Sequence, residues 1–159
     1  RPGATGPHST RVPSERWTLH PTAKQVARQV IDEESQEFPR PNENRIGKPY
    51  RYAYTMSLPD GFDAASPNQS KLFKHDLEAG GKQVHDFGTG HIPGEFVFVP
   101  RKGGSSEDDG WLMGYVVNMA EETTDLVILN AQDFSGTPVA TVHIPHRIPP
   151  GFHGNWVPA

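Results

Sequence analysis

The sequence predicts an all-β protein, and three features support that prediction. Its 159 residues include 16 Gly and 16 Pro, a composition that favours short strands and many turns over helices. In residues 50–56 the aromatic side chains alternate strictly with other residues, so they share one face of a strand. Further short candidate strands follow one another between turns. A chain of this length can bury the core of one ordinary domain.

The first candidate strand pair, at residues 16–20 and 24–32, is ambiguous. Residues 24–32 contain good helix formers, so intrinsic propensity alone favours a helix there. The intervening Pro21, Thr22 and Ala23 also fit the turn of a hairpin. The residues themselves leave both possibilities open.

The later strands are marked by the turns between them. Residues 71–77 and 83–87 flank Gly80 and Gly81, which supply the positive φ angles of a tight hairpin connection. We interpret Glu107-Asp108-Asp109 as a solvated turn, since it lacks the alternating ligands of a calcium loop. Residues 1–15 are rich in Pro and Gly without periodicity and are predicted to be a linker or disordered. The remaining predicted strands are residues 95–99, 111–119, 125–130 and 138–144.

The composition also excludes several classes of function. The chain has no cysteine, so disulfides and thiolate metal sites are excluded, and a cytoplasmic location is favoured. A net charge of -4 without long basic runs argues against nucleic acid as a partner. No apolar run reaches the length of about 18 residues that a transmembrane helix needs. The eight histidines leave imidazole, together with carboxylate, as the available transition-metal chemistry.

His153 is the first site candidate. It lies between Gly151 and Gly154, which allow close backbone approach, and beside Phe152 and Trp156, which offer apolar walls. A single histidine in an apolar segment is more often a packed core residue than a metal ligand, so this signal alone is weak.

The other histidines are weaker candidates. His75 and His85 fall on opposite arms of a predicted hairpin, and nothing brings them or His91 together. His143 and His146 are three residues apart, which places them on opposite faces of an extended strand. A shared metal is therefore not expected at either group.

Three segments, in the order in which they occur, resemble the carotenoid cleavage oxygenases, a family that includes stilbene-cleaving dioxygenases and the retinoid isomerase. The resemblance covers residues 16–159, and the joint occurrence is far more specific than any one segment. One departure is Phe96, where the family usually has proline, and it concerns the local turn rather than the neighbouring carboxylate. The segments are Glu37-Phe38-Pro39-Arg40, residues 94–101 followed by 107–112, and residues 151–156.

The resemblance implies a seven-bladed β-propeller with iron on its axis. Since a blade takes about 40 to 45 residues, residues 16–159 are expected to form about three C-terminal blades of one propeller domain. It also implies two strands in residues 16–32, so we favour the hairpin. Because the chain starts at Arg1 and matches only the C-terminal part of the family, we expect a fragment of a longer enzyme. A free-standing β-sandwich is the structural alternative.

The resemblance also implies a metal site. In the family, four neutral histidines hold one Fe(II), and outer glutamates accept hydrogen bonds from the ligands' remaining ring N–H groups. His153 matches the fourth histidine, while Glu37 and Glu95 match the second and third outer glutamates. The other three ligands would come from the N-terminal remainder of the propeller. We expect Glu95 to pair with His153 and Glu37 to point at a histidine outside this chain, since such partners fix the tautomer of a ligand.

The expected function follows from the same resemblance. The chain would be the C-terminal portion of a non-haem Fe(II) dioxygenase that uses dioxygen to cleave a C=C bond in a conjugated apolar substrate. A carotenoid, an apocarotenoid and a stilbene-like compound all fit, and alkene isomerisation also occurs in the family. The chain alone is expected to be inactive. The alternative is a non-enzymatic β-rich binding or scaffold module in which His153 is merely packed.

Overall fold

The computed structural model describes residues 11–58, 70–149 and 151–157. Within these residues the regular structure is β-strand, apart from one short 3₁₀ turn, η1 (Glu43–Arg45), so the all-β prediction is confirmed. No helix in this part of the chain is long and apolar enough to cross a membrane. The strands are β1 (Pro13–His20), β2 (Gln25–Pro41), β3 (Tyr52–Ser57), β4 (Lys71–Asp76), β5 (Lys82–Asp86), β6 (His91–Pro93), β7 (Val97–Pro100), β8 (Gly110–Asn118), β9 (Thr123–Asn130) and β10 (Ala140–Ile144).

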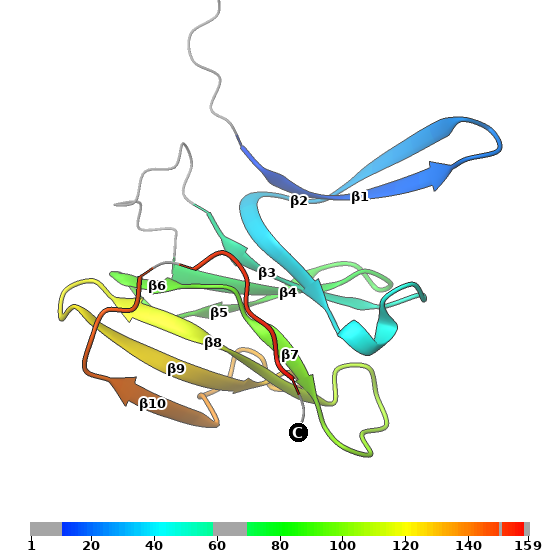
Figure 1. Cartoon of the computed structure of the whole chain (residues 1–159). Helices are drawn as coiled ribbons and strands as arrows, with labels where there is room; N and C mark the ends of the chain where they lie inside the picture. The colour runs from blue at the N-terminus through cyan, green and yellow to red at the C-terminus, as the bar shows by residue number, and fades with distance from the viewer. Residues whose placement is uncertain (1–10, 59–69, 150, 158–159) are drawn as a thin grey trace, which may run out of the picture.

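The strands form two antiparallel sheets (Figure 1). The first has the order β1-β2-β3-β4-β5, and the second has the order β10-β9-β8-β6, with β7 also pairing with β8. β2 is 17 residues long and is shared between two partners: its first part pairs with β1 and its last part with β3. The residue count predicted about three blades. The described strands instead make two blade-sized sheets and a two-stranded ribbon.

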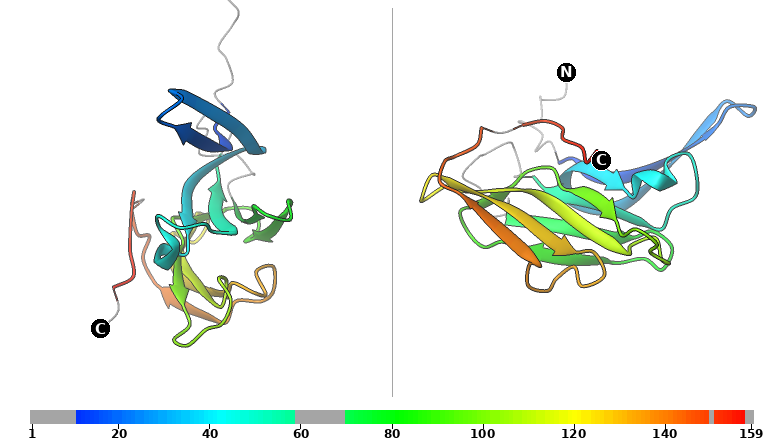
Figure 2. Two further views of the ribbon diagram at one scale, coloured as in Figure 1. Left: turned by 90° about the vertical axis from the view of Figure 1, so that its right-hand side faces the viewer. Right: turned by 60° about the horizontal axis from the view of Figure 1, so that its bottom comes forward.

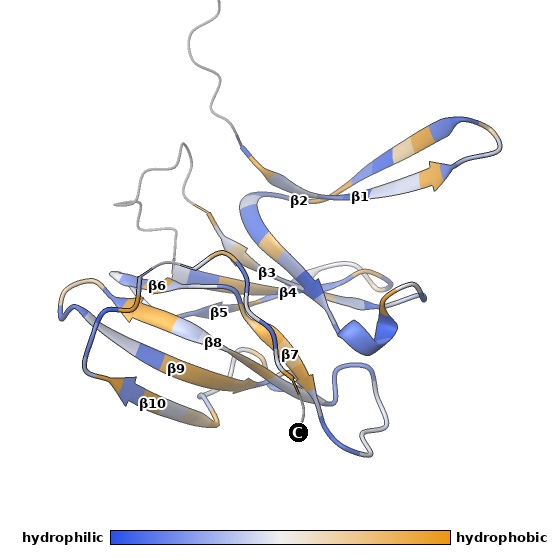
Figure 3. Ribbon diagram, viewed as in Figure 1, coloured by the Kyte–Doolittle hydropathy of each residue, from blue (hydrophilic) through white to orange (hydrophobic). Residues whose placement is uncertain are grey.

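The β1–β2 ribbon extends away from the sheets (Figures 1 and 2) and confirms the predicted hairpin. Cross-strand contacts explain why a hairpin forms despite the helical propensity: Arg28 pairs with Glu15 at 2.7 Å and lies 4.9 Å from the Trp17 ring centre. Lys24 takes a positive φ of 52° in the turn. β1 begins at Pro13, inside the stretch predicted as a linker, and residues 1–10 lie outside the described residues. Figure 3 shows apolar bands along this ribbon.

Two of the predicted turns have different outcomes. Gly80 and Gly81 have φ angles of 78° and 94°, as the hairpin between β4 and β5 requires. Residues 107–108 form the predicted turn, but the prediction that this turn is solvated is wrong. Glu107 accepts hydrogen bonds from two backbone N–H groups at the start of β3, and the buried Asp108 pairs with Lys74 at 2.7 Å. Carboxylates that satisfy neighbouring donors are structural groups here.

The main core lies between the two sheets. Tyr54 from β3 stacks on Phe98 from β7 with 5.8 Å between ring centres, which is typical aromatic packing. Each Å² of apolar area that the whole core buries stabilises the packing of the two sheets by about 25 cal/mol. The buried apolar side chains of this core are Tyr54, Met56, Leu72, Phe96, Phe98, Leu112, Val116, Val127, Leu129, Ala131 and Phe134.

A second, smaller buried region lies on the other face of the first sheet. His75 is only 2% exposed, and its Nε2 lies 2.8 Å from the side-chain carbonyl oxygen of Gln36. The Thr55 hydroxyl donates to the same oxygen at 2.7 Å. Burial lowers the pKa of His75 from its usual 6.5, although the carboxylates of Asp32 and Glu34 act in the opposite direction.

The lowered pKa predicts a loss of stability at mildly acidic pH. Above pH 6.5 the His75 imidazole is neutral in both states, and below that value the unfolded chain takes up a proton that the folded chain resists. The free energy of unfolding should therefore fall between pH 7.5 and pH 5.5, with a slope for His75 of at most about 1.4 kcal/mol per pH unit below pH 6.5. His85, whose pKa burial also lowers, contributes with the same sign.

Urea unfolding followed by tryptophan fluorescence measures this dependence. His75→Gln should flatten the pH dependence, because the group that resists protonation is gone. His20→Gln, at an exposed position at the end of β1, controls for the loss of a histidine. An identical pH dependence in His75→Gln and the parent chain would contradict the prediction.

Candidate metal site

A β-bulge positions Glu95 at the edge of the second sheet. β6 and β7 lie along the same side of β8, and between them residues 94–96 stand opposite only residues 114–115. The Gly94 N–H still donates to the carbonyl of Tyr115 at 2.8 Å. Because one extra residue is inserted, the edge bends and its side chains are redirected. Glu95 lies in the middle of this bulge.

The bulge depends on a close approach between Phe96 and Gly114. A Cβ atom on Gly114 would lie 2.4 Å from Cδ2 of the Phe96 ring, so only glycine fits there. Phe96 is 4% exposed and fills the core. The position where the family usually has proline therefore holds a buried aromatic anchor. Because strand neighbours point to opposite faces, Glu95 turns away from the core.

A second bulge lies in β2. Phe38 and Pro39 together stand opposite the single residue Thr55 of β3. Phe38 has a φ of 53°, a left-handed conformation that is rare for a bulky residue and stores strain. Proline is tolerated at a bulge because no ladder hydrogen bond is required there. The bulge lies between Glu37 and Arg40. The regular alternation of strand faces therefore does not relate the directions of these two side chains.

The C-terminal segment, residues 151–157, meets both bulges. It forms no strand and passes beside β7 and η1 (red in Figure 1). The His153 Nδ1 lies 3.2 Å from one carboxylate oxygen of Glu95, and the Gly154 N–H donates to the other at 2.7 Å. The Phe38 ring meets the imidazole edge-on, with 5.6 Å between ring centres. The predicted pairing of Glu95 with His153 is thus present in the structure.

Burial differs sharply between the two partners. The Glu95 side chain is 6% exposed, whereas the His153 side chain is 73% exposed. A carboxylate on Nδ1 favours the tautomer with hydrogen on that nitrogen and leaves Nε2 with a free lone pair. The arrangement fits one imidazole ligand of a metal site. In the described part of the chain, no group of three or more His, Asp or Glu side chains could hold a metal by itself.

Arg40 is the residue at this site that sequence reasoning missed. Its Nη1 lies 3.5 Å from Glu95 Oε1, and its Nη2 donates to the carbonyl of Gly154 at 3.0 Å. Arg40 was part of a quoted motif, but its contacts are 114 residues away in the chain. The only local signal was its position after Glu37-Phe38-Pro39.

Glu37 is not brought to this site. Its side chain is exposed, and among the described residues it forms no hydrogen bond or ion pair. The structure thus joins Glu95 to His153 and leaves Glu37 facing outward from the β2 bulge. Its pairing with a histidine outside this chain stays a prediction.

Three other histidines of the described residues have structural or surface positions. His75 and His85 lie on opposite faces of the first sheet, since His75 pairs in register with Lys82 and His85 with Leu72. Nδ1 of His85 lies 3.0 Å from the carbonyl of Phe134. His143 is exposed and pairs with Asp125 on the neighbouring strand at 2.7 Å.

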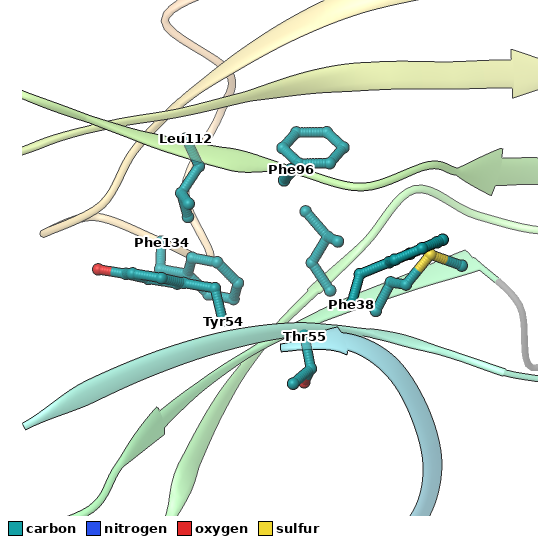
Figure 4. A pocket seen from close by; sticks show the side chains of 8 residues that line it. Phe38, Tyr54, Thr55, Phe96, Leu112 and Phe134 are labelled. Carbon is teal, nitrogen blue, oxygen red and sulfur yellow. The ribbon is translucent and has the colours of Figure 1, made fainter. Parts of the chain in front are cut away.

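A small cavity lies between the sheets (Figure 4). Its volume is about 10 Å³, which is room for at most one water molecule. It cannot hold a conjugated organic substrate. The side chains that line it are Phe38, Tyr54, Thr55, Met56, Leu72, Phe96, Leu112 and Phe134.

Comparison with known sequences places this site in a family. The family model of the retinal pigment epithelial membrane protein matches residues 3–158. A carotenoid cleavage oxygenase of Mycobacterium tuberculosis is 40% identical over 96% of this chain and 31% of its own length. The apocarotenoid-15,15'-oxygenase of Synechocystis is 38% identical over 89% of this chain and 28% of its own length. Resveratrol cleavage oxygenase 1 of Aspergillus fumigatus is 30% identical over 97% of this chain and 34% of its own length.

Solved structures agree with the sequences. A variant of Synechocystis apocarotenoid oxygenase superposes with a TM-score of 0.82 at 36% identity, covering 91% of this chain and 30% of that structure. The cobalt-substituted form of the same enzyme gives the same TM-score. These enzymes are seven-bladed propellers, so the two packed sheets are blades of such a ring and not a free-standing sandwich.

The chain spans about a third of the length of these relatives. The match over residues 3–158 covers the Glu95 bulge, the β2 bulge and the C-terminal segment that carries His153. This chain therefore belongs to the retinal pigment epithelial membrane protein family, the family of the carotenoid cleavage oxygenases.

Proposed function

We propose that this chain is the C-terminal portion of a non-haem Fe(II) dioxygenase that cleaves a C=C bond of a conjugated apolar substrate into two carbonyl products. One observation carries the proposal: the buried Glu95 carboxylate holds one nitrogen of His153 while the ring itself is largely exposed. Membership of the carotenoid cleavage oxygenase family supplies the reaction class. We also propose a cytoplasmic location, which the absence of cysteine supports.

In this proposal His153 is one of four histidine ligands. Glu95 accepts a hydrogen bond from the Nδ1–H, which fixes the tautomer of the ring and orients Nε2 toward the axis of the propeller. The N-terminal remainder of the propeller supplies the other three histidines. When bound, Fe(II) would bind and activate the dioxygen that reacts with the alkene.

In this proposal the outer carboxylates compensate the positive charge of the bound metal. Neutral imidazole ligands leave the full charge of the metal in place, and bound cations dominate the electrostatics of their surroundings. Glu95 carries a negative charge one hydrogen bond away from the ligand. We propose that Glu37 does the same for a histidine of the N-terminal remainder, which its exposed position on β2 allows.

The substrate chamber is proposed to lie between this chain and the N-terminal remainder. Phe152 is 83% exposed and Trp156 is 47% exposed, and both lie within three residues of His153 in the sequence. Apolar walls of this kind suit a conjugated hydrocarbon chain. The relatives are named for carotenoids, an apocarotenoid and resveratrol, which share a conjugated alkene.

The first prediction of the proposed function concerns metal loading. This chain alone should hold no stoichiometric iron and cleave no alkene, because a single histidine cannot retain Fe(II) against water. Together with the N-terminal remainder of the propeller it should bind one iron per molecule. Metal analysis and an alkene-cleavage assay on both preparations test this. Cleavage by the isolated chain would overturn the ligand assignment, and persistent absence of iron in the complete protein would favour a binding or scaffold module.

The second prediction concerns the residues of the pair. In the complete protein Glu95→Gln should weaken iron binding by about 10- to 100-fold without unfolding, since it removes the charge that orients the ligand. His153→Ala should be more severe because it deletes a ligand. Glu121→Gln, in an exposed turn between β8 and β9, is the matched control. Equal iron affinity in Glu95→Gln and Glu121→Gln would remove Glu95 from the site.

The third prediction separates the two outer glutamates. Glu37→Gln should also lower iron affinity, although Glu37 has no partner among the described residues. The reason is its proposed partner in the N-terminal remainder. Iron titration of Glu37→Gln in the complete protein measures it, and an affinity equal to that of the parent would show that Glu37 is a solvated surface residue.

A further inference from the structure

We infer that Arg40 is a positioning residue that fastens the C-terminal segment to the body of the protein and thereby presents His153 to the metal. The role of His153 as a ligand rests on the proposed function. The fastening itself rests on contacts within this chain.

The guanidinium of Arg40 contacts both the segment and the body of the protein. Nη1 lies 3.5 Å from the Glu95 carboxylate, and Nη2 donates to the Gly154 carbonyl at 3.0 Å and to the Asn155 side-chain oxygen at 3.2 Å. Nη2 also pairs with Glu43 at 3.0 Å. The Arg40 side chain is 19% exposed, so these contacts are partly shielded from water.

The segment has few other attachments. Residues 151–157 form no strand and are exposed throughout. Within the described residues, the hydrogen bonds from residues 153–155 to the rest of the chain involve only three side chains. These are Glu95, Arg40 and Glu43, the last of which accepts from the Asn155 side-chain N–H at 3.2 Å. Loss of one of the three therefore removes a large part of the docking.

Arginine is suited to this task because of its shape. Its planar guanidinium presents several N–H donors in a fixed fork, whereas the ammonium of lysine is a compact point charge. Arg40 comes from the bulge of β2, and Glu95 comes from the bulge beside β7. The fork thus links the two sheets and the segment at one point.

The charges of the cluster also favour docking before a metal arrives. Glu95 is 6% exposed, and an unpaired carboxylate there would be costly. Arg40 offers a positive charge to that carboxylate and to Glu43, so neither depends on the metal for a partner. His153 is consequently held in place in the metal-free protein.

The first test uses hydrogen exchange in the metal-free complete protein, with this chain joined to the N-terminal remainder. The Gly154 amide donates to Glu95 at 2.7 Å and reports docking directly. Arg40→Met should speed its exchange by about tenfold, since exchange follows local opening. Arg101→Met removes an exposed ion pair with Asp109 and should leave the rate unchanged. Equal Gly154 exchange in Arg40→Met and Arg101→Met would overturn the inference.

Arg40→Lys serves as a milder variant in case Arg40→Met folds poorly. It keeps the positive charge and loses the fork, so Gly154 exchange should still be faster than in the parent. Parental exchange in Arg40→Lys would overturn the bridging role of the guanidinium.

The second test asks whether Arg40 acts through His153. In the complete protein Arg40→Met should weaken Co²⁺ binding by about 10- to 100-fold and shift the Co²⁺ absorption spectrum toward that of His153→Ala. In a double-mutant cycle the effect of Arg40→Met should vanish when His153 is already alanine. The same loss in both backgrounds would mean that Arg40 supports the fold in general, which would overturn the inference. Absence of any Co²⁺ or Fe²⁺ binding by the parent would defeat the proposed function, while the exchange test would still decide the fastening.

Discussion

The burial of the Glu95 carboxylate is the constraint on which the rest of this site depends. A charge with a 6% exposed side chain must be fully provided with donors, or it would be expelled or neutralised. The partners are the His153 ring, the Gly154 backbone N–H and the Arg40 guanidinium, the last as an ion pair at 3.5 Å. Two of these three belong to a segment with no secondary structure of its own. The requirement of one carboxylate therefore fixes where the C-terminal segment lies.

Two of the backbone irregularities, the bulges at residues 94–96 and 38–39, lie around that carboxylate. One bulge turns Glu95 outward and needs a glycine at position 114, because a side chain there would collide with Phe96. The other holds Phe38 at a φ of 53° and sends its ring against the imidazole. Regular strands would have satisfied more backbone hydrogen bonds and stored less strain. Departures of this kind persist where a function requires them, so their coincidence with one histidine supports its role in the site.

Sequence patterns predicted the parts of the fold that depend on near neighbours. Alternating aromatic residues identified β3, and paired glycines identified the hairpin after β4. The continuation of β2 to Pro41 was missed, because Pro39 reads as a strand terminator and is tolerated only at a bulge. The pairing of Glu95 with His153 spans 58 residues, and local periodicity carries no information about such a distance. That pairing was predicted from the family resemblance. The contacts of Arg40 were not predicted, because the resemblance assigned no role to that residue.

The Glu95 side chain is buried, whereas the His153 side chain is exposed. In the proposed metal site, this chain orients one ligand and the N-terminal remainder of the propeller supplies the others. In that proposal, the orientation of His153 and the compensation of the metal's positive charge by Glu95 depend on contacts among residues of this chain. The other ligands would have to come from outside, because in the described residues no group of three or more His, Asp or Glu side chains could hold a metal. An imidazole fastened at one nitrogen and open at the other has already lost most of its rotational freedom, so binding a metal orders it little further. If His153 is a ligand as proposed, the chain holds it in place before a metal binds, and the affinity of the completed site would depend on how rigidly His153 is held.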